Sequence, residues 1–394
     1  MTDVTASPIP AALPPYREVV RQRGRTLLLV SFIVIAIAGA VGGIGISLSA
    51  GSGEGTGLSL FYAMIPLPLL WFVFWWLDRY EPEPRRYKFA GFVWGGVVAV
   101  AIALTLELWA QKAFDLSDDA TASFVAPLAE EPAKCLFLLL TFVRSRRVID
   151  GVLDGLIYAG IVGIGFAFIE NIGYYASSYT ESADYQVAGA GGVTSTFVVR
   201  GLFSPFAHPL FTAAFGVAIG LAVSRKSKVA RFLIGTLGLA ASIGLHALWN
   251  GSLSYDETGT AFVLAYLALA ALLLATAVLA IVVRVRQVRI LERSLSYVAQ
   301  RGWIHPAEIP YLSRFGHRKA ARRFATKNHG KVAGQVVKRY QRLSSEMAFL
   351  HDALMSGRSK PHGVERTYAL LDAMYALRPA LRFPPALQNT TRHS

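Results

Sequence analysis

The sequence contains few charged residues and only one cysteine. Its 394 residues include 39 Lys and Arg and 25 Asp and Glu, so charged side chains make up 16% of the chain, against roughly 25% in soluble domains. Hydrophobic residues make up 54%, which is more apolar surface than a soluble protein of this length would be expected to hide. The lone Cys135 excludes an internal disulfide framework and a metal site built from several cysteines.

The basic charge lies at the C-terminal end. Residues 284–394 hold 21 Lys and Arg against 6 Asp and Glu, a net charge of +15, whereas the first 283 residues sum to −1. This division predicts three parts: a cytoplasmic N-terminal tail at 1–26, an eight-helix transmembrane domain at 27–286 and a basic cytoplasmic region at 287–394. Helical patterns occur in the basic region, whose charge is suited to anionic lipid headgroups. No nucleic-acid-binding motif is present, so we expect no nucleic-acid partner.

Eight stretches are long and apolar enough to cross a bilayer, which takes about 20 residues of helix. They cover residues 27–49, 58–77, 89–110, 122–143, 149–175, 196–223, 229–255 and 260–283. The sequence therefore predicts an all-α polytopic membrane protein in which a basic helical segment follows about eight spans. Small residues four apart, such as Gly151 with Gly155 and Gly216 with Gly220, permit close packing of helices in lipid.

Loop charges predict the orientation. The N-terminal tail and the loops after the second, fourth and sixth spans hold fifteen basic residues, and the other loops hold only Lys112. Because cytoplasmic loops carry the excess of Lys and Arg, both termini are expected in the cytoplasm of a multi-pass cell-membrane protein. The lipid bilayer is thus the first expected partner.

Ionisable side chains occur inside four of these spans, where each costs several kcal/mol by the lower estimates. Glu130 and Glu131 lie in the fourth span, Glu170 in the fifth, His208 in the sixth and His246 in the seventh. Counted along each helix at 1.5 Å per residue, all of them fall roughly 8 to 18 Å below the outer surface. A shared depth in the outer leaflet predicts one polar site between helices.

Local spacing indicates roles for two helical pairs. Glu130 and Lys134 are four residues apart, so Lys134 can compensate that carboxylate as structural support. His246 and Asn250 share a helix face in the same way. Pro205 and Pro209 flank His208 and should distort the sixth span there. Arg200 lies close enough to the outer end to extend toward water, and we expect a structural or lipid-facing role for it.

Two carboxylates and two imidazoles at one depth suit the activation of water. A glutamate can act as general base while His and Asn polarise a carbonyl and hold the oxyanion. Alternatively, His208, His246 and Glu131 can bind zinc and leave a fourth position open for water. Both a zinc-dependent and a metal-free mechanism remain open, because no His-Glu-x-x-His signature is present. The non-catalytic alternative is a buried ion pair that holds two helices together.

The ordered set of these residues resembles the PrsW family of bacterial intramembrane proteases, distant relatives of the CAAX prenyl endopeptidase (Abi) superfamily. The resemblance covers about residues 58–283. It rests on Glu130-Glu131-x-x-Lys134, on Asp154-Gly155-x-x-Tyr158, on Phe166-x-x-x-Glu170-Asn171 and on single histidines in the next two spans. In the related prenyl endopeptidases the second motif carries His where this chain has Glu170. That difference leaves fewer imidazoles for a three-histidine zinc site.

The resemblance implies an eight-helix endopeptidase that cuts a single-pass membrane protein, such as an anti-sigma factor, on its extracytoplasmic side. Carried over by motif, Glu130 and Glu131 are the catalytic carboxylate pair, and Glu170 is the acid of the second motif. His208 and His246 are the later imidazoles, and His246 with Asn250 resembles an oxyanion-binding pair. In our working hypothesis Glu131 activates the water.

Two other classes of function compete with this interpretation. A proton- or ion-coupled transporter also needs ionisable groups inside its spans. Transporters often show inverted repeats with sites at the bilayer midplane, whereas no repeat relates residues 27–143 to 149–283. A non-enzymatic membrane scaffold that has kept the fold is the third candidate.

Overall fold

The computed structural model describes residues 53–80, 83–144, 148–180, 189–255, 258–357 and 363–384. In these ranges the chain forms helices joined by turns, with no strand. Two compact units are present, with a boundary between Ala280 and Ile281. The predicted tail at 1–26 and the predicted first span at 27–49 lie outside the described residues.

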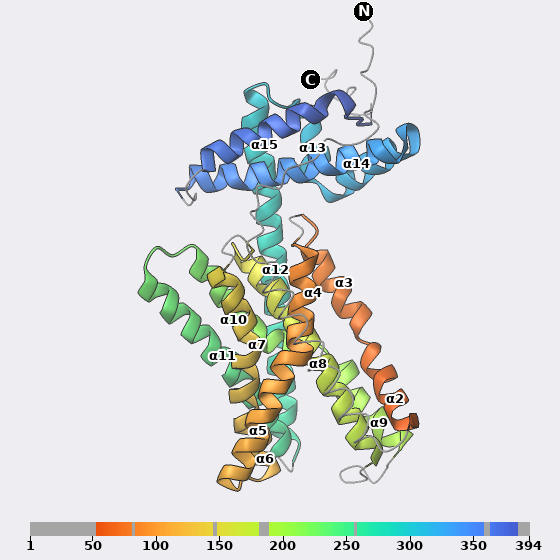
Figure 1. Ribbon diagram of the computed structural model, residues 1–394, viewed down its shortest axis with the longest axis vertical. Coiled ribbons are helices and arrows are strands. Elements are labelled where there is room, and N and C mark those ends of the chain that lie inside the picture. The colour runs from red at the N-terminus through yellow and green to blue at the C-terminus, as the bar shows by residue number, and fades with distance from the viewer. Residues whose placement is uncertain are drawn as a thin grey trace, which may run out of the picture. The chain divides into compact units, whose positions relative to one another are not determined.

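The first unit holds the apolar helices, which Figure 1 colours from orange to green. Its elements up to the fourth predicted span are α2 (Gly53–Met64), α3 (Leu67–Leu77), α4 (Arg85–Val93), η1 (Trp94–Ala99), α5 (Val100–Phe114), α6 (Asp118–Ala120), η2 (Thr121–Val125) and α7 (Ala126–Arg144). The remaining ones are α8 (Val152–Thr180), α9 (Ala190–Phe197), η3 (Val198–Phe203), α10 (Ala207–Val223) and α11 (Lys228–Ser254). The helix α12 (Thr260–Gln300) begins in this unit and ends in the second.

Six helical stretches of the described residues are long and apolar enough to cross a membrane. They are Glu54–Leu77, Arg85–Phe114, Val152–Thr180, Ala190–Val223, Lys228–Ser254 and Thr260–Gln300. The predicted span at 122–143 is helical as η2 and α7, but it holds Glu130, Glu131 and Lys134 in its middle and is not one of these six. The chain is therefore an all-α polytopic membrane protein, as predicted, although the count of eight spans is not confirmed.

Apolar side chains cover the outside of this unit, and charged ones lie within it. Large exposed side chains include Phe232, Leu237 and Leu264, whereas Glu131 and Lys134 are completely buried. In α8, 83% of the most apolar stretch is buried, against 6% in α12. Exposed apolar side chains around a buried charged cluster are expected of a helical bundle surrounded by lipid, because only the interior can satisfy polar groups.

Glycines let α8 and α10 approach closely, as the small-residue spacing predicted. A Cβ atom added to Gly155 would lie 2.0 Å from the carbonyl oxygen of Gly216, and one added to Gly216 would lie 2.4 Å from that of Gly155. Gly163 packs in the same way against the backbone of Pro209. The backbone contact at Pro209 fixes the first turn of α10, where His208 lies, against the middle of α8.

The second unit consists of the end of α12, η4 (Pro306–Glu308), α13 (Ile309–Ser313), α14 (Phe315–Met355), α15 (Gly363–Leu377) and η5 (Arg378–Ala380). The helix α14 folds back on itself at Gly330, whose φ of 85° and ψ of 171° break the helix. Arg318 consequently donates to the carbonyl oxygen of Gln341 at 3.3 Å and to Ser345 Oγ at 2.8 Å. A straight helix would separate Arg318 from Gln341 by roughly 35 Å. Ala321, Ala325, Ala333 and Val337 form the small core between the two arms.

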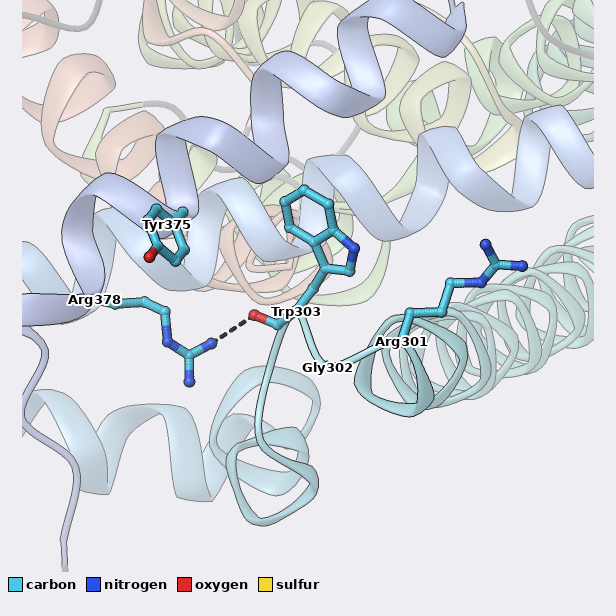
Figure 2. A pocket seen from close by; sticks show the side chains of 5 residues that line it. All are labelled: Arg301, Gly302, Trp303, Tyr375 and Arg378. Carbon is cyan, nitrogen blue, oxygen red and sulfur yellow. Dashed lines mark hydrogen bonds between the residues drawn. The ribbon is translucent and has the colours of Figure 1, made fainter.

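An open hollow of about 220 Å³ lies on the second unit, lined by Arg301, Gly302, Trp303, Tyr375 and Arg378. Figure 2 shows Arg378 donating to the backbone carbonyl of Trp303, at 2.6 Å. Arg378 also donates to Glu308 at 2.8 Å. These contacts attach the end of α15 to the turn that follows α12.

Candidate active site

Four helices bring the predicted acid and imidazole groups together. Glu130, Glu131 and Lys134 lie on α7, Glu170 lies on α8, and His246 lies on α11. His208 is the second residue of α10, directly after the break at 204–206 that the two flanking prolines predicted. All of these side chains are buried or nearly so within the apolar unit.

Lys134 is the centre of the cluster. Its Nζ lies 2.6 Å from Glu131 Oε1, 3.0 Å from Glu130 Oε2 and 3.1 Å from His208 Nδ1. It also lies 3.9 Å from the centroid of the Phe166 ring, a cation–π distance. A completely buried ammonium needs such partners, since an isolated charge in an apolar interior is very costly.

Both oxygens of Glu131 have protein partners. Oε1 receives Lys134 and, at 3.1 Å, His246 Nδ1. Oε2 accepts from Thr212 Oγ1 at 3.1 Å and lies 2.7 Å from Ser242 Oγ, whose single proton also faces the carbonyl oxygen of Phe211 at 2.8 Å. A carboxylate has about four lone-pair positions, and here four polar groups of the protein lie around them.

Glu130 is engaged on one side only. Its Oε2 accepts from Lys134 and lies 3.8 Å from His246 Nδ1 and 3.9 Å from His208 Nδ1. Within the described residues, Oε1 has no hydrogen-bond partner. The two neighbouring glutamates are therefore different chemically: Glu131 is held by the protein, and Glu130 keeps a free acceptor.

The hydrogen bonds define the proton positions on both histidines. An ammonium can only donate, so His208 Nδ1 accepts from Lys134 and its Nε2 carries the proton. That Nε2 lies 2.7 Å from Glu170 Oε2. His246 Nδ1 faces the carboxylate of Glu131 and donates to it, which leaves Nε2 as the basic nitrogen when the ring is neutral. The His246 ring stacks on Phe211 with centroids 4.9 Å apart.

A polar cavity of about 50 Å³ borders this cluster. Its polar lining residues are Glu170, Asn171, Tyr174, Arg200, Ser204, His208 and Asn250. One water needs roughly 10–15 Å³ of such space together with polar partners, so the cavity has room for a few water molecules. It is too small for an extended peptide.

Asn250 and Arg200 have hydrogen-bond partners that the sequence did not indicate. Asn250 donates to the backbone carbonyl of Ala122 in η2 at 2.8 Å, which ties α11 to the start of α7. For Arg200 the sequence predicted a structural or lipid-facing role, and the structure shows the structural one. Arg200 donates to Glu170 at 2.6 Å and to Asn171 at 2.8 Å.

Thr212 and Ser242 belong to the site and were missed from the sequence. Thr212 follows His208 by four residues, and Ser242 precedes His246 by four. One helical turn therefore separates each hydroxyl from a predicted histidine. The signal was the i,i+4 spacing that identified Asn250, but hydroxyl groups are so common in membrane helices that spacing alone does not select them.

One donor atom from each of Glu130, Glu131, His208 and His246 falls within a group whose members all lie within 4.8 Å of one another. Two imidazoles and two carboxylates are ligands that zinc accepts. The donor types therefore fit a divalent cation, which Glu131 and His208 would bind in exchange for one of their present hydrogen bonds. Lys134 already places a positive charge beside three of these four residues.

The sequence model for the PrsW family intramembrane metalloproteases matches residues 83–282, just over half of the chain. The chain belongs to this family. The matched region contains every predicted PrsW site residue from Glu130 to Asn250. It begins later than the resemblance deduced from the sequence, and it leaves out the second unit from residue 283 onward.

Two curated PrsW proteins are similar to this chain. Protease PrsW of Geobacillus kaustophilus (strain HTA426) is 29% identical over 145 residues, which cover 37% of this chain and 58% of the relative. Protease PrsW of Clostridioides difficile (strain 630) is 32% identical over 158 residues, which cover 39% of this chain and 62% of the relative. The chain thus spans about three fifths of the length of these relatives. No solved structure matches it.

Proposed function

We propose that this chain is an intramembrane endopeptidase that hydrolyses a peptide bond by means of activated water. The observation that carries the proposal is the buried cluster of Glu130, Glu131, Lys134, His208 and His246 beside a polar cavity in an apolar helical unit. Membership of the PrsW family supports the same reaction class. A site that merely joined helices would need neither a free carboxylate oxygen nor an adjacent space for water.

Glu130 is the better general base of the two neighbouring glutamates. Our sequence-based hypothesis gave this role to Glu131, around whose oxygens four polar groups of the protein lie. Glu130 has Oε1 available and can take a proton from water while the water oxygen bonds to the carbonyl carbon. The same carboxyl then gives the proton to the departing amine nitrogen as the C–N bond breaks.

The other residues hold the reacting groups. Glu131 fixes the ring of His246 through Nδ1, so that Nε2 can accept a hydrogen bond from the attacking water. Asn250 uses one amide hydrogen on Ala122 and has a second one available for the oxyanion that forms on the carbonyl oxygen. Lys134 balances the charge of the two carboxylates and orients His208. All of this takes place away from bulk water, where fixed dipoles act most strongly.

Glu130, Glu131, His208 and His246 are the residues that would hold a metal ion, and the description of the family as metalloproteases makes zinc the first candidate. A bound divalent ion would polarise the scissile carbonyl and lower the pKa of water. The protein residues named above would still supply the proton transfers and orientation. A metal-free mechanism uses the same residues with Lys134 as the resident cation.

The substrate we propose is a single-pass membrane protein, such as an anti-sigma factor, cut near the extracytoplasmic side. The asymmetry of the loop charges supports this side, because it predicts cytoplasmic termini and hence a cluster in the outer leaflet. The size of the cavity implies that the helices around it must separate before a peptide segment can enter.

The proposal is tested by reconstituting the full chain in vesicles with tagged single-pass membrane proteins, anti-sigma factors included. Wild type should release a shortened product. Glu130→Gln should lower the cleavage rate about 100- to 10,000-fold, as expected when a general base is removed, without affecting insertion. Unchanged cleavage by this variant would remove Glu130 from its role. Ion flux without cleavage, insensitive to Glu130→Gln, would favour the transporter alternative.

A further inference from the structure

Arg200 is connected to the polar site by its contacts with one face of α8. It lies in η3, a π-helical segment (Val198–Phe203) just before the break that precedes α10. Its Nη2 donates to Glu170, its Nε donates to Asn171, and its guanidinium carbon lies 3.7 Å from the centroid of the Tyr174 ring. Residues 170, 171 and 174 of α8 share one side of that helix, so a single guanidinium holds three positions at once.

The carboxylate oxygen that Arg200 contacts also faces His208. Glu170 Oε2 lies 2.6 Å from Arg200 Nη2 and 2.7 Å from His208 Nε2. The order of contacts is Arg200, Glu170, His208, Lys134 and then the two glutamates of α7. Arg200 therefore touches none of the proposed reacting groups and reaches them only through Glu170.

The surroundings of Glu170 explain why a fixed cation is needed there. The Glu170 and Arg200 side chains are 17% and 20% exposed, and both line the cavity. Without the guanidinium, the carboxylate could turn toward water in the cavity and release His208. His208 Nε2–H would then lose its acceptor, and its ring could rotate away from Lys134. A planar guanidinium prevents this because it contacts two neighbouring acceptors in one geometry.

We propose that Arg200 is a positioning residue, which clamps Glu170 so that Glu170 fixes the ring of His208 beside Lys134 and Glu130. The proposal rests on the proposed endopeptidase function. It assigns Arg200 no contact with substrate. Its removal should therefore lower kcat and leave KM nearly unchanged. Since the clamp depends on both the charge and the shape of the guanidinium, a lysine at position 200 should restore part of the lost kcat, and an uncharged side chain should restore none.

The experiment compares Arg200→Met, Arg200→Lys and wild type in the vesicle cleavage assay. Arg200→Met should reduce kcat about 10- to 100-fold, the range typical of residues that orient a functional group, with KM changed less than about threefold. The kcat of Arg200→Lys should lie between those of wild type and Arg200→Met. Arg231→Met serves as the matched control, since among the described residues that arginine donates to the nearby carbonyl of Lys226 and to none of the site residues.

Three results would overturn the proposal while wild type cleaves normally. They are full activity in Arg200→Met, a loss confined to KM, and a lysine variant no better than the methionine variant. An inactive wild type would instead overturn the proposed function. In that case a thermal melting cycle of Arg200→Met, Glu170→Gln and the double variant still tests the clamp. Non-additive losses support the ion pair, and additive losses contradict it.

Discussion

At the scale of single residues, the site shows how an apolar body tolerates charge. Lys134 and two glutamates lie at or near zero exposure, but the Nζ atom of Lys134 has three partners within hydrogen-bond distance. Such a network is not a gain in stability relative to apolar residues, because desolvation offsets the attraction. Removing one charged member of the network does destabilise the protein, since the remaining charges stay buried without compensation.

Lys134→Met should therefore destabilise the protein by about 3–5 kcal/mol, the usual cost of leaving a buried partner unpaired. Thermal or denaturant unfolding of the detergent-solubilised chain measures this. Lys112→Met is the matched control, because Lys112 is exposed in the last turn of α5. Equal stability of both variants would contradict the central role of Lys134.

The metal content of the purified full-length protein separates the two mechanisms. If the four donors bind zinc as their chemistry suggests, wild type should contain close to one ion per chain. Substitutions His208→Ala, His246→Ala and Glu131→Gln should each reduce that content, measured by elemental analysis. A folded and active wild type without metal would instead support the metal-free mechanism, in which Lys134 is the only cation of the cluster.

At the scale of helices, the irregular segments lie around the site. The π-helical segments η1, η2 and η3 precede α5, α7 and the break before α10, and each of them adds a residue to a turn. π-Helical turns are frequent at functional sites. Arg200 lies in η3, and η2 supplies the carbonyl group that Asn250 binds.

The close approach of α8 and α10 positions His208 and yields a sharp prediction. Gly155→Ala should destabilise the fold strongly, because the new Cβ would lie 2.0 Å from the Gly216 carbonyl oxygen, and backbone would have to move. Gly244→Ala in α11 is the control, since nothing lies within 4 Å of its added Cβ. Alanine in an open helical position is worth about 0.5–1 kcal/mol over glycine. Melting temperatures should therefore move in opposite directions, and a similar shift in both would refute the close packing.

At the scale of the whole molecule, the two units follow different rules. The first exposes many large apolar side chains and buries charged site residues within its apolar core, whereas the second has an ordinary small core and a strongly basic surface. The PrsW match ends near the boundary between them, at residue 282. That the second unit is cytoplasmic and contacts anionic lipid remains a proposal.

The second unit should lose stability in acid through His351. Burial lowers the pKa of His351 below its ordinary value of 6.5, and nearby Arg293 and Arg301 oppose protonation while Asp352 favours it. The unfolded chain therefore binds the proton at higher pH than the folded chain. The free energy of unfolding of the second unit should keep its full value above about pH 6.5 and should decrease as the pH drops below that value.

Limited proteolysis of the full chain between pH 7.5 and 5.5, followed with an antibody to the C-terminal region, measures this effect. His351→Gln should show a weaker dependence on pH, because it removes the group that takes up the proton. His351→Gln leaves the neighbouring Tyr297 in place, whose ring centroid lies 4.8 Å from that of His351. A pH dependence equal to that of wild type would contradict the assignment.

The amino-acid sequence by itself determined the class of fold and the residue types of the site. Long apolar runs can only be helices in lipid, because every backbone group must be satisfied within the segment. Buried Glu, Lys and His residues in such runs are costly enough to mark a site, so Glu130, Glu131, Glu170, His208 and His246 could be named in advance. Their shared depth followed from the fixed rise of a helix.

Only the tertiary structure decided which atoms face one another. Helical periodicity gives the depth of a side chain but not the rotation of its helix relative to neighbours that are distant in sequence. For that reason the sequence could not show that Thr212 and Ser242 face Glu131, or that Glu130 has a free oxygen. It also left a structural and a lipid-facing role open for Arg200, because an arginine near a helix end can reach either water or a neighbouring helix. The packing of η3 against α8 made that choice.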